Sequence, residues 1–360
     1  MYLAITIKKI SFLALFIISG STLFAQSYRF QHLGAEDGLC DNFIYNVSQD
    51  NNGFLWMGTG EGLCRYDGFN FTDEAYIGDS IPDEPVQISY TDKKGRMWFG
   101  FANGTIAFLK DRTMKVLNPE NESGTVVGID EDNNGNIIVA TQNNGLIRIS
   151  KNLNLTTILK GIENHFISSM LITSENKILL GTWDGLFLYD DPGRNDQLDL
   201  IGRIEDIPYT RVQVIQYNKD RNSFFIGTRD EGLFIMTTGD NILQNYRITK
   251  VGDELDIQYI DVQDVYENDE DNLWISSGGE GVYRLIYNEQ EKKYLSKVLY
   301  NEKNGLHTSY IRDIFEDREG NLWFGSYGEG LFVLKDQAFS FYEPEAGSFD
   351  SKHHFERPFR

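Results

Sequence analysis

Aromatic and arginine side chains stand at glycine-rich turns in several places along this chain of 360 residues. Four of them follow short apolar runs directly: Phe101, Trp183, Arg229 and Tyr327. Aromatic rings pack against the apolar C–H faces of sugars, and the planar guanidinium group donates hydrogen bonds to sugar hydroxyl groups. These residues therefore predict a binding site for an oligosaccharide or a similar small polar ligand.

Longer connections between apolar runs carry a second set of aromatic and polar side chains. They are Asp41, Asn42, His165, Tyr209, Arg211, His307 and Tyr310. The same chemistry applies to them, since rings can stack on a sugar and polar groups can bind its hydroxyls. We expect both sets to contribute to one site, provided that the fold brings turns and connections to the same face.

Patterns for catalysis are weak. The sequence has five histidines: His32, His165, His307, His353 and His354. They show no metal-ligand spacing, and there is no Gly-x-Ser-x-Gly elbow or phosphate-binding loop. We predict a binding protein without cofactor or metal rather than an enzyme. A glycosidase carboxylate pair is defined by its separation in space, so a carbohydrate-active hydrolase or lyase on the same fold is the alternative, and a protein-docking scaffold is another.

One acidic turn resembles the first half of a calcium-binding loop. Residues 130–135 read Asp-Glu-Asp-Asn-Asn-Gly, but Thr141 occupies the twelfth position, where such a loop needs a bidentate glutamate. Aspartate and asparagine also cap tight reversals, and glycine readily takes the left-handed conformation. The stretch therefore predicts a turn rather than a calcium site.

A repeated unit must position all these residues. Its clearest copy, residues 311–335, reads as a strand, an Asp-x-x-Gly turn, a strand, a glycine-rich reversal and a third strand. The closing glycine recurs at intervals of 40 to 49 residues, at Gly62, Gly104, Gly145, Gly185, Gly232, Gly281 and Gly330. This period is the length of one four-stranded propeller blade. We predict an all-β fold, a seven-bladed β-propeller of four-stranded antiparallel blades, over residues 26–345.

Successive turns of a blade alternate between its two faces. The Asp-x-x-Gly turns are thus expected on one face, and the glycine-rich reversals on the other, together with the connections between blades. A recurring large apolar position on the central strand holds Trp56, Trp98, Ile138, Leu179, Phe225, Trp274 and Trp323. We expect this column to pack between blades rather than to bind ligand. Either residues 28–33 or residues 339–342 are expected to supply the outer strand of the last blade.

The ends of the chain and its composition add further expectations. Residues 1–25 resemble a cleaved signal peptide, and residues 346–360 form a polar tail, so we expect a periplasmic or secreted protein. The formal net charge of −21 opposes binding to nucleic acid or to anionic membranes. Cys40 and Cys64, the two cysteines, are expected to be independent thiols because they form no disulfide framework.

The repeat resembles a known family. An Asp-x-x-Gly turn, Leu-Trp-Phe-Gly-Ser or a close variant, and Gly-Leu follow one another as in the two-component regulator propeller repeat, and residues 30–33 and 36–39 resemble its opening. The resemblance implies the periplasmic sensing part of a hybrid sensor kinase of Bacteroidetes, with a membrane sensor kinase or a second propeller as a partner. This sequence shows no kinase core, phosphoacceptor helix or spanning helix, so we expect a free-standing propeller, a truncated product or a piece of a longer protein.

Overall fold

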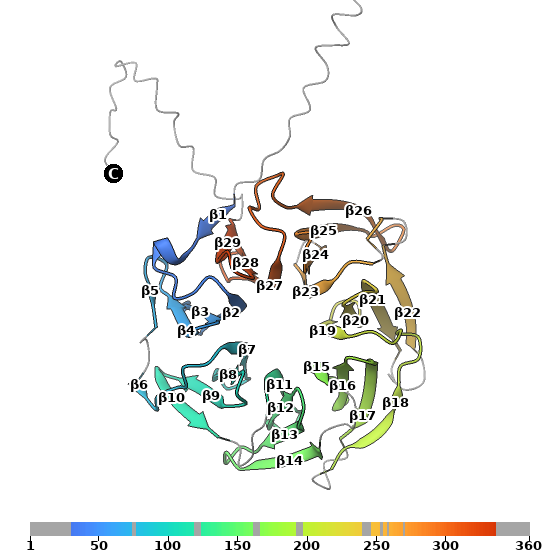
Figure 1. Cartoon of the computed structure of the whole chain (residues 1–360). Helices are drawn as coiled ribbons and strands as arrows, with labels where there is room; N and C mark the ends of the chain where they lie inside the picture. The colour runs from blue at the N-terminus through green and yellow to red at the C-terminus, as the bar shows by residue number, and fades with distance from the viewer. Residues whose placement is uncertain are drawn as a thin grey trace, which may run out of the picture.

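The structure is a computed structural model that describes residues 30–73, 77–118, 124–160, 166–191, 197–239, 246–252, 255–257, 259–268 and 271–335. The described residues form seven sheets arranged in a ring around a central axis (Figure 1). Every pair of consecutive strands within a repeat is antiparallel. The predicted seven-bladed propeller of four-stranded blades is confirmed.

Each of the first three blades has four strands, which follow one another from the inner to the outer edge of the blade. They are β2 (Ile44–Gln49), β3 (Leu55–Thr59), β4 (Gly62–Tyr66) and β5 (Phe71–Thr72); β7 (Val86–Thr91), β8 (Met97–Phe101), β9 (Ile106–Lys110) and β10 (Thr113–Leu117); and β11 (Val126–Glu131), β12 (Ile137–Thr141), β13 (Gly145–Ile149) and β14 (Leu155–Lys160). A short extra strand, β6 (Ile77–Gly78), pairs in parallel with β10.

The next three blades and the inner part of the seventh follow in the same order. They are β15 (Ile167–Ile172), β16 (Lys177–Thr182), β17 (Gly185–Asp190) and β18 (Asp199–Arg203); β19 (Val212–Asn218), β20 (Ser223–Thr228), β21 (Leu233–Thr238) and β22 (Tyr246–Val251); β23 (Val262–Glu267), β24 (Asn272–Ser277), β25 (Val282–Asn288) and β26 (Lys293–Tyr300); and β27 (Ile311–Glu316), β28 (Leu322–Ser326) and β29 (Leu331–Leu334).

The N-terminal strand closes the ring. Strand β1 (Gln31–Leu33) pairs antiparallel with β29 and becomes the outer strand of the seventh blade (Figure 1). The 3₁₀ turn η1 (Ala35–Asp37) then leads the chain toward the first blade. Closure by the predicted N-terminal segment is thus confirmed, while the competing segment, residues 339–342, lies outside the described residues. Pairing the two ends of the repeat array covers the outer edge of β29, which would otherwise be left unpaired.

The hydrophobic core consists of clusters that lie between neighbouring blades. Trp56 of the first blade packs with Val86 and Phe99 of the second, and Trp323 of the seventh packs with Leu55 of the first. Each position of the predicted apolar column belongs to one of seven such clusters. The expectation that the column packs between blades is confirmed.

The Asp-x-x-Gly turns anchor this column by hydrogen bonds. Asp317 Oδ1 accepts from the backbone N–H groups two and four residues later, at 3.0 and 2.8 Å, and its Oδ2 accepts from the indole N–H of Trp323 at 2.7 Å. The same indole-to-carboxylate bond joins Trp98 to Asp92 at 2.9 Å. One carboxylate therefore caps the turn and also accepts from a buried indole N–H group. Without a partner, that buried N–H group would lower the stability of the fold.

The expectation of two independent thiols is wrong. Cys40 and Cys64 form a disulfide with their Cα atoms 5.8 Å apart. The segment that leaves β1 passes over β4 before it enters β2, and this passage brings together two cysteines that are 24 residues apart. The disulfide therefore ties the ring-closing segment to the first blade.

Removing this disulfide is expected to lower stability. Closing a loop of this length restricts the unfolded chain, which is worth about 3 kcal/mol in the chain-entropy description. The double variant Cys40→Ser/Cys64→Ser should therefore lose about 3 kcal/mol in the free energy of unfolding, measured by urea titration with tryptophan fluorescence. Adding dithiothreitol should bring the wild type to the variant's value, and equal stability of both proteins without reductant would contradict the prediction.

Candidate functional site

Backbone hydrogen bonds place the glycine-rich reversals beside the connections between blades. Trp183 N donates to Phe166 O at 3.0 Å, Arg229 N to Arg211 O at 3.0 Å, and Tyr327 N to Tyr310 O at 3.1 Å. In each bond the reversal belongs to one blade and the acceptor lies in the connection that enters that blade. We call this side of the ring the connection face. The predicted grouping of reversals and connections is confirmed.

Two groups of exposed aromatic rings lie on the connection face. Trp183 is 41% exposed, and its ring centroid lies 4.9 Å from that of Phe166. Tyr327 is 55% exposed, and its ring meets that of Phe43 edge to face at 5.0 Å. Tyr310, also exposed, accepts the backbone N–H of Tyr327 through its carbonyl. Rings held in pairs by backbone pairing present firm apolar surfaces to a ligand.

Each innermost strand has a β-bulge near the connection face. The register shift always falls between the first and third residues of the strand, so the second residue has no partner opposite it. The seven bulged residues are Tyr45, Gln87, Val127, Ser168, Gln213, Gln263 and Arg312. A bulge redirects a side chain away from the regular alternation. A ring of mostly polar side chains therefore surrounds this end of the axis.

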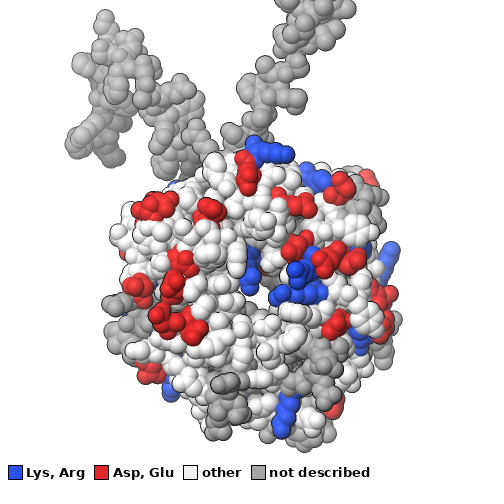
Figure 2. Space-filling view, viewed as in Figure 1, with Lys and Arg blue, Asp and Glu red and all other residues white. Residues whose placement is uncertain are grey.

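Three arginines converge on the same region. Arg211 immediately precedes β19, Arg229 follows β20, and Arg312 is the bulged residue of β27. Burial lowers the pKa of Arg211, and the positive charges of Arg312 and Arg229 lower it further. The three charges therefore lie within electrostatic reach of one another. Figure 2 shows lysine or arginine atoms gathered beside a hollow at the centre of the ring, with acidic atoms adjoining them on the outer side.

Aromatic rings rather than carboxylates contact two of these guanidinium groups. Arg211 Cζ lies 5.4 Å from the centroid of the Trp183 ring, and Arg312 Cζ lies 4.9 Å from that of Tyr45. Across the part of the chain that the structure describes, Arg211, Arg229 and Arg312 form no ion pair. The hollow is therefore locally positive in a strongly acidic protein.

The acidic group that acts on Arg211, Asp261, is engaged elsewhere. Its Oδ1 accepts hydrogen bonds from Gln213 Nε2 at 2.6 Å and from Gln263 Nε2 at 2.9 Å. Its charge raises the pKa of Arg211, but burial and the two neighbouring arginines outweigh it, since the net shift is downward. Asp261 therefore moderates the positive charge of the cluster without neutralising it.

Some of the predicted site residues do not face a ligand. Phe101 is fully buried in the core between the first and second blades, so its prediction as a ligand contact is wrong. The reason is that it is the last residue of β8 and its side chain points between blades. Asn42 links the ends of the ring: its Oδ1 accepts from Ala35 N at 3.0 Å and its carbonyl accepts from Gly330 N at 2.9 Å. It serves closure rather than binding.

The remaining predicted residues are dispersed. Asp41 lies against the first reversal, since a Cβ on Gly60 would meet its Oδ2 at 2.5 Å. Tyr209 is 77% exposed and lies under the guanidinium of Arg203 at 3.8 Å. His307 is exposed in the connection that enters the seventh blade, and His165 lies outside the described residues. Among the predicted residues, the structure thus brings together Arg211, Arg229 and Trp183, and separately Tyr310 and Tyr327.

Sequence reasoning missed Arg312, Tyr45, Phe43 and Phe166. Arg312 and Tyr45 lie inside strands, outside the turns and connections from which ligand contacts were predicted, while Phe43 and Phe166 lie in connections but were not among the predicted residues. One signal was available: aligned copies of the repeat carry a polar residue at the second position of nearly every innermost strand. A polar side chain at a fixed place in an otherwise apolar strand marks a site where the strand is irregular or functional.

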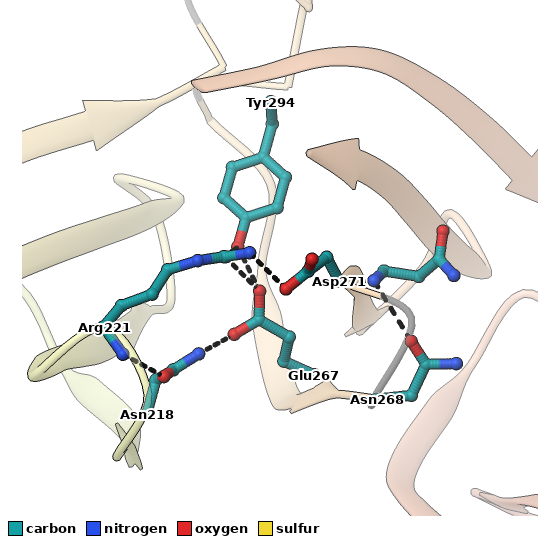
Figure 3. A network of polar contacts seen from close by, with 7 residues as sticks. Asn218, Arg221, Glu267, Asn268, Asp271 and Tyr294 are labelled. Carbon is teal, nitrogen blue, oxygen red and sulfur yellow. Dashed lines mark hydrogen bonds and ion pairs between the residues drawn. The ribbon is translucent and has the colours of Figure 1, made fainter. Parts of the chain in front are cut away.

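A second polar cluster lies between the fifth and sixth blades (Figure 3). Arg221 Nη2 lies 2.5 Å from Asp271 Oδ1, its Nη1 binds Glu267, and the hydroxyl of Tyr294 donates to Glu267 Oε1 at 2.7 Å. Asn218 completes the contact to Glu267. Because its charges are paired, this network joins two blades and offers a ligand little unsatisfied charge.

A cavity of about 670 Å³ adjoins this network and is lined in part by Lys250, Lys293 and Arg221. Each of these cations already has a carboxylate partner. Lys250 Nζ lies 2.9 Å from Glu231 Oε2, and Lys293 Nζ lies 3.6 Å from Glu291 Oε2. Arg247 and Lys292 also line the cavity and form no ion pair among the described residues, so the cavity retains positive charge of its own.

Among the described residues, no group of three or more His, Cys, Asp or Glu side chains is placed to hold a metal ion. In the same residues, no helix is long and apolar enough to cross a membrane.

The acidic stretch 130–135 forms the predicted turn. Asp132 Oδ1 accepts hydrogen bonds from Asn134 N at 2.9 Å and Asn136 N at 2.8 Å, and Gly135 has a φ of 75°.

Comparison with known proteins agrees with the repeat pattern. A model of the two component regulator propeller family matches residues 38–61 and 305–328, which lie in the first and last copies of the repeat. No curated protein matches the sequence.

Solved structures share the fold. The extracellular domain of the putative hybrid two component system BT3049 from B. thetaiotaomicron superposes with a TM-score of 0.66 at 20% identity, over 85% of this chain and 42% of that one. The corresponding domain of BT4673 gives 0.64 at 20% identity, over 85% and 40%. Virginiamycin B lyase from Staphylococcus aureus gives 0.65 at 16% identity, over 86% and 99%. The chain thus spans about two fifths of the length of the two sensor domains.

Proposed function

We propose, from the premise that this chain carries two-component regulator propeller repeats, that it is an extracytoplasmic ligand-binding propeller for two-component signalling. Its ligand is an oligosaccharide or a similar polar molecule bound on the connection face. The observation that carries this proposal is that the exposed ring of Trp183 lies beside the guanidinium group of Arg211 on the connection face, with Arg229 next to Arg211. A membrane sensor kinase or a second propeller would receive the signal.

The chemistry of the face suits sugars better than purely apolar ligands. Trp183 offers a flat apolar surface, and Arg211 beside it offers planar donors at the same place. A sugar ring has an apolar C–H face and hydroxyls at its edge, so both groups can act on one ring. The bulged glutamines Gln213 and Gln263 lie on the same side of the ring; their Nε2 groups already donate to Asp261, and their amide oxygens can accept hydrogen bonds from a ligand.

An exported location fits the disulfide. Cys40 and Cys64 are bonded to each other, and such bonds persist in oxidising compartments rather than in the reducing cytosol. Together with the signal-peptide pattern of residues 1–25, this supports a periplasmic or secreted protein.

Replacing Trp183 is expected to weaken glycan binding about tenfold, because stacking on an exposed ring contributes on the order of 1 kcal/mol or more to the free energy of binding. The wild type is first screened with a panel of oligosaccharides by thermal shift, and the Kd of each hit is measured by isothermal titration calorimetry for Trp183→Ala.

Phe69→Ala is the matched control, since Phe69 is an 89% exposed aromatic residue that lies just before β5, in the outer part of the first blade. Its Kd should equal that of the wild type. The proposal fails if the panel contains no binder, or if both variants bind every hit as tightly as the wild type does.

Hydrolase or lyase activity is the competing proposal, and it is supported by likeness of fold alone. Incubating the protein with the same panel of oligosaccharides separates a binding module from an enzyme, because an enzyme converts the glycans that it binds. Chromatography of each mixture should show intact oligosaccharide if the protein is a binding module, whereas new reducing ends or unsaturated products would favour the enzyme.

A further inference from the structure

We propose that the ligand is an acidic saccharide and that Arg211, Arg229 and Arg312 bind its carboxylate or sulfate group at the hollow of the connection face. This inference rests on the proposed function and names the ligand class. Aromatic stacking alone would bind neutral and acidic sugars equally well. The arginines add a preference for a negatively charged ligand.

The first argument is that three arginines with no ion pair among the described residues lie within electrostatic reach of one another, whereas four others have carboxylate partners. Arg96, Arg148, Arg203 and Arg221 each form an ion pair with a carboxylate, at 2.5 to 2.7 Å for the first three. With 54 acidic residues against 33 basic ones, partners are abundant. In the part of the chain that the structure describes, the three arginines at the hollow are nevertheless left without an ion pair. Such a cluster weakens the free protein by mutual repulsion and is compensated when an anion binds.

The second argument is the way in which the fold holds the three groups. Arg211 and Arg229 are adjacent because the backbone N–H of Arg229 donates to the carbonyl of Arg211 at 3.0 Å. Arg312 approaches from the seventh blade because the bulge in β27 redirects it. The three groups therefore come from two different blades, with the sixth blade between them, and they remain close enough for their charges to interact.

The third argument is that the guanidinium groups retain donor capacity. Arg211 lies near the face of Trp183, and Arg312 near the face of Tyr45, which leaves N–H edges for a ligand. Arg211 Nε is buried and lacks a hydrogen-bond partner among the described residues. Carboxylate and sulfate oxygens match the fork geometry of guanidinium, and such charge-assisted bonds are stronger than those to neutral hydroxyls.

The arrangement also links charge to stacking. Because Trp183 and Arg211 are neighbours, a sugar ring lying on Trp183 would bring an acidic substituent at its edge toward the arginines. An acid group on the sugar therefore satisfies both features at once, whereas a neutral sugar leaves the positive cluster uncompensated.

The test uses pairs of oligosaccharides that differ in charge alone. Oligogalacturonides are compared with their methyl esters, and chondroitin sulfate oligosaccharides with their desulfated, carboxyl-reduced forms; binding to the full chain is measured by isothermal titration calorimetry. At least one acidic member should bind at least tenfold more tightly than its neutral counterpart. Arg211→Gln and Arg312→Gln should each weaken that binding at least tenfold, a much larger loss than either variant causes in the binding of neutral glycans. Tight binding of oligogalacturonides identifies a carboxylate ligand, and chondroitin oligosaccharides that lack only their sulfate groups show whether a sulfate is needed.

Arg247→Gln is the control, because Arg247 is exposed on β22 and lines the other cavity. Arg229→Gln tests whether a loss of binding reflects misfolding. Because Arg229 is exposed, this variant should have the same or a higher free energy of unfolding than the wild type without ligand, and yet it should bind the acidic oligosaccharide more weakly. This inference is overturned if the protein prefers neutral glycans, or if all three arginine variants still bind the acidic oligosaccharide as tightly as the wild type does. Either result leaves the proposed function standing. If neither charged nor neutral glycans bind, both fall.

Discussion

Replacing Gly58 with alanine is expected to lower the free energy of unfolding by about 4 kcal/mol. A Cβ at this position would lie 2.4 Å from the carbonyl oxygen of Val86 and 2.2 Å from Asn46 Nδ2. Val86 begins the innermost strand of the next blade, and its carbonyl accepts a hydrogen bond from that same Nδ2 at 3.2 Å. Overpacking costs about 1–3 kcal/mol, and breaking a buried hydrogen bond costs about 1–3 kcal/mol more.

Urea denaturation followed by tryptophan fluorescence measures this loss. Gly202→Ala is the matched control: Gly202 lies in β18 with no atom within 4 Å of an added Cβ, so its replacement should change stability by less than about 0.5 kcal/mol. Equal stability of both variants would show that the blades can move apart to accept the methyl group.

The same close approach recurs in four more blades, whereas the third and sixth blades carry Ala140 and Ser276 at this position. An added Cβ would meet Val126 at 2.3 Å from Gly100, Val212 O at 2.8 Å from Gly181, Val262 at 2.5 Å from Gly227 and Ile44 at 2.7 Å from Gly325. In each case the nearby residue is the first one of the next innermost strand. In these blades the glycine therefore sets the distance to the next blade.

Replacing Asp264 with asparagine is expected to remove a pH dependence of stability of up to about 4 kcal/mol. Burial raises the pKa of Asp264 to about 7, while its Oδ2 accepts the backbone N–H of Ile314 at 2.9 Å. Burial also raises the pKa of Asp313, the nearby charge of Asp264 raises it further, and Arg312 opposes this. Between about pH 4 and pH 7 the folded protein therefore binds more protons than the unfolded chain.

Stability must consequently fall as pH rises through this window. Each pKa unit corresponds to about 1.4 kcal/mol, which sets the size of the effect. The free energy of unfolding should decrease from pH 4.5 to pH 8 in the wild type and much less in Asp264→Asn, whose amide oxygen can still accept the Ile314 N–H. Asp199→Asn, an exposed site, controls for net charge. Parallel pH profiles for wild type and Asp264→Asn would contradict the prediction.

Much of the fold could be predicted because most repeats share the same local features. An aspartate that caps its turn and accepts from Trp323, a glycine that lets the next strand approach, and a large apolar residue between them recur at a fixed spacing. The position of Cys40 against Cys64 could not be predicted, because it depends on where one irregular segment crosses a neighbouring strand.

The candidate site was predicted only in part. Turn residues such as Trp183 and Arg229 could be assigned to one face, since the alternation of turns follows from antiparallel pairing. The same logic placed Phe101 on that face, although its side chain is buried. It overlooked Arg312, whose orientation depends on a bulge rather than on regular alternation.

The amino-acid sequence by itself determined the seven blades, their order and the apolar column between them, because these follow from short-range turns and from contacts between adjacent repeats. Only the tertiary structure decided which side chains meet at the centre. Closing the ring brings Arg211 of the fifth blade toward Arg312 of the seventh, about 100 residues away along the chain. No local pattern encodes that distance, because it depends on the number of blades and on the bulge in each innermost strand.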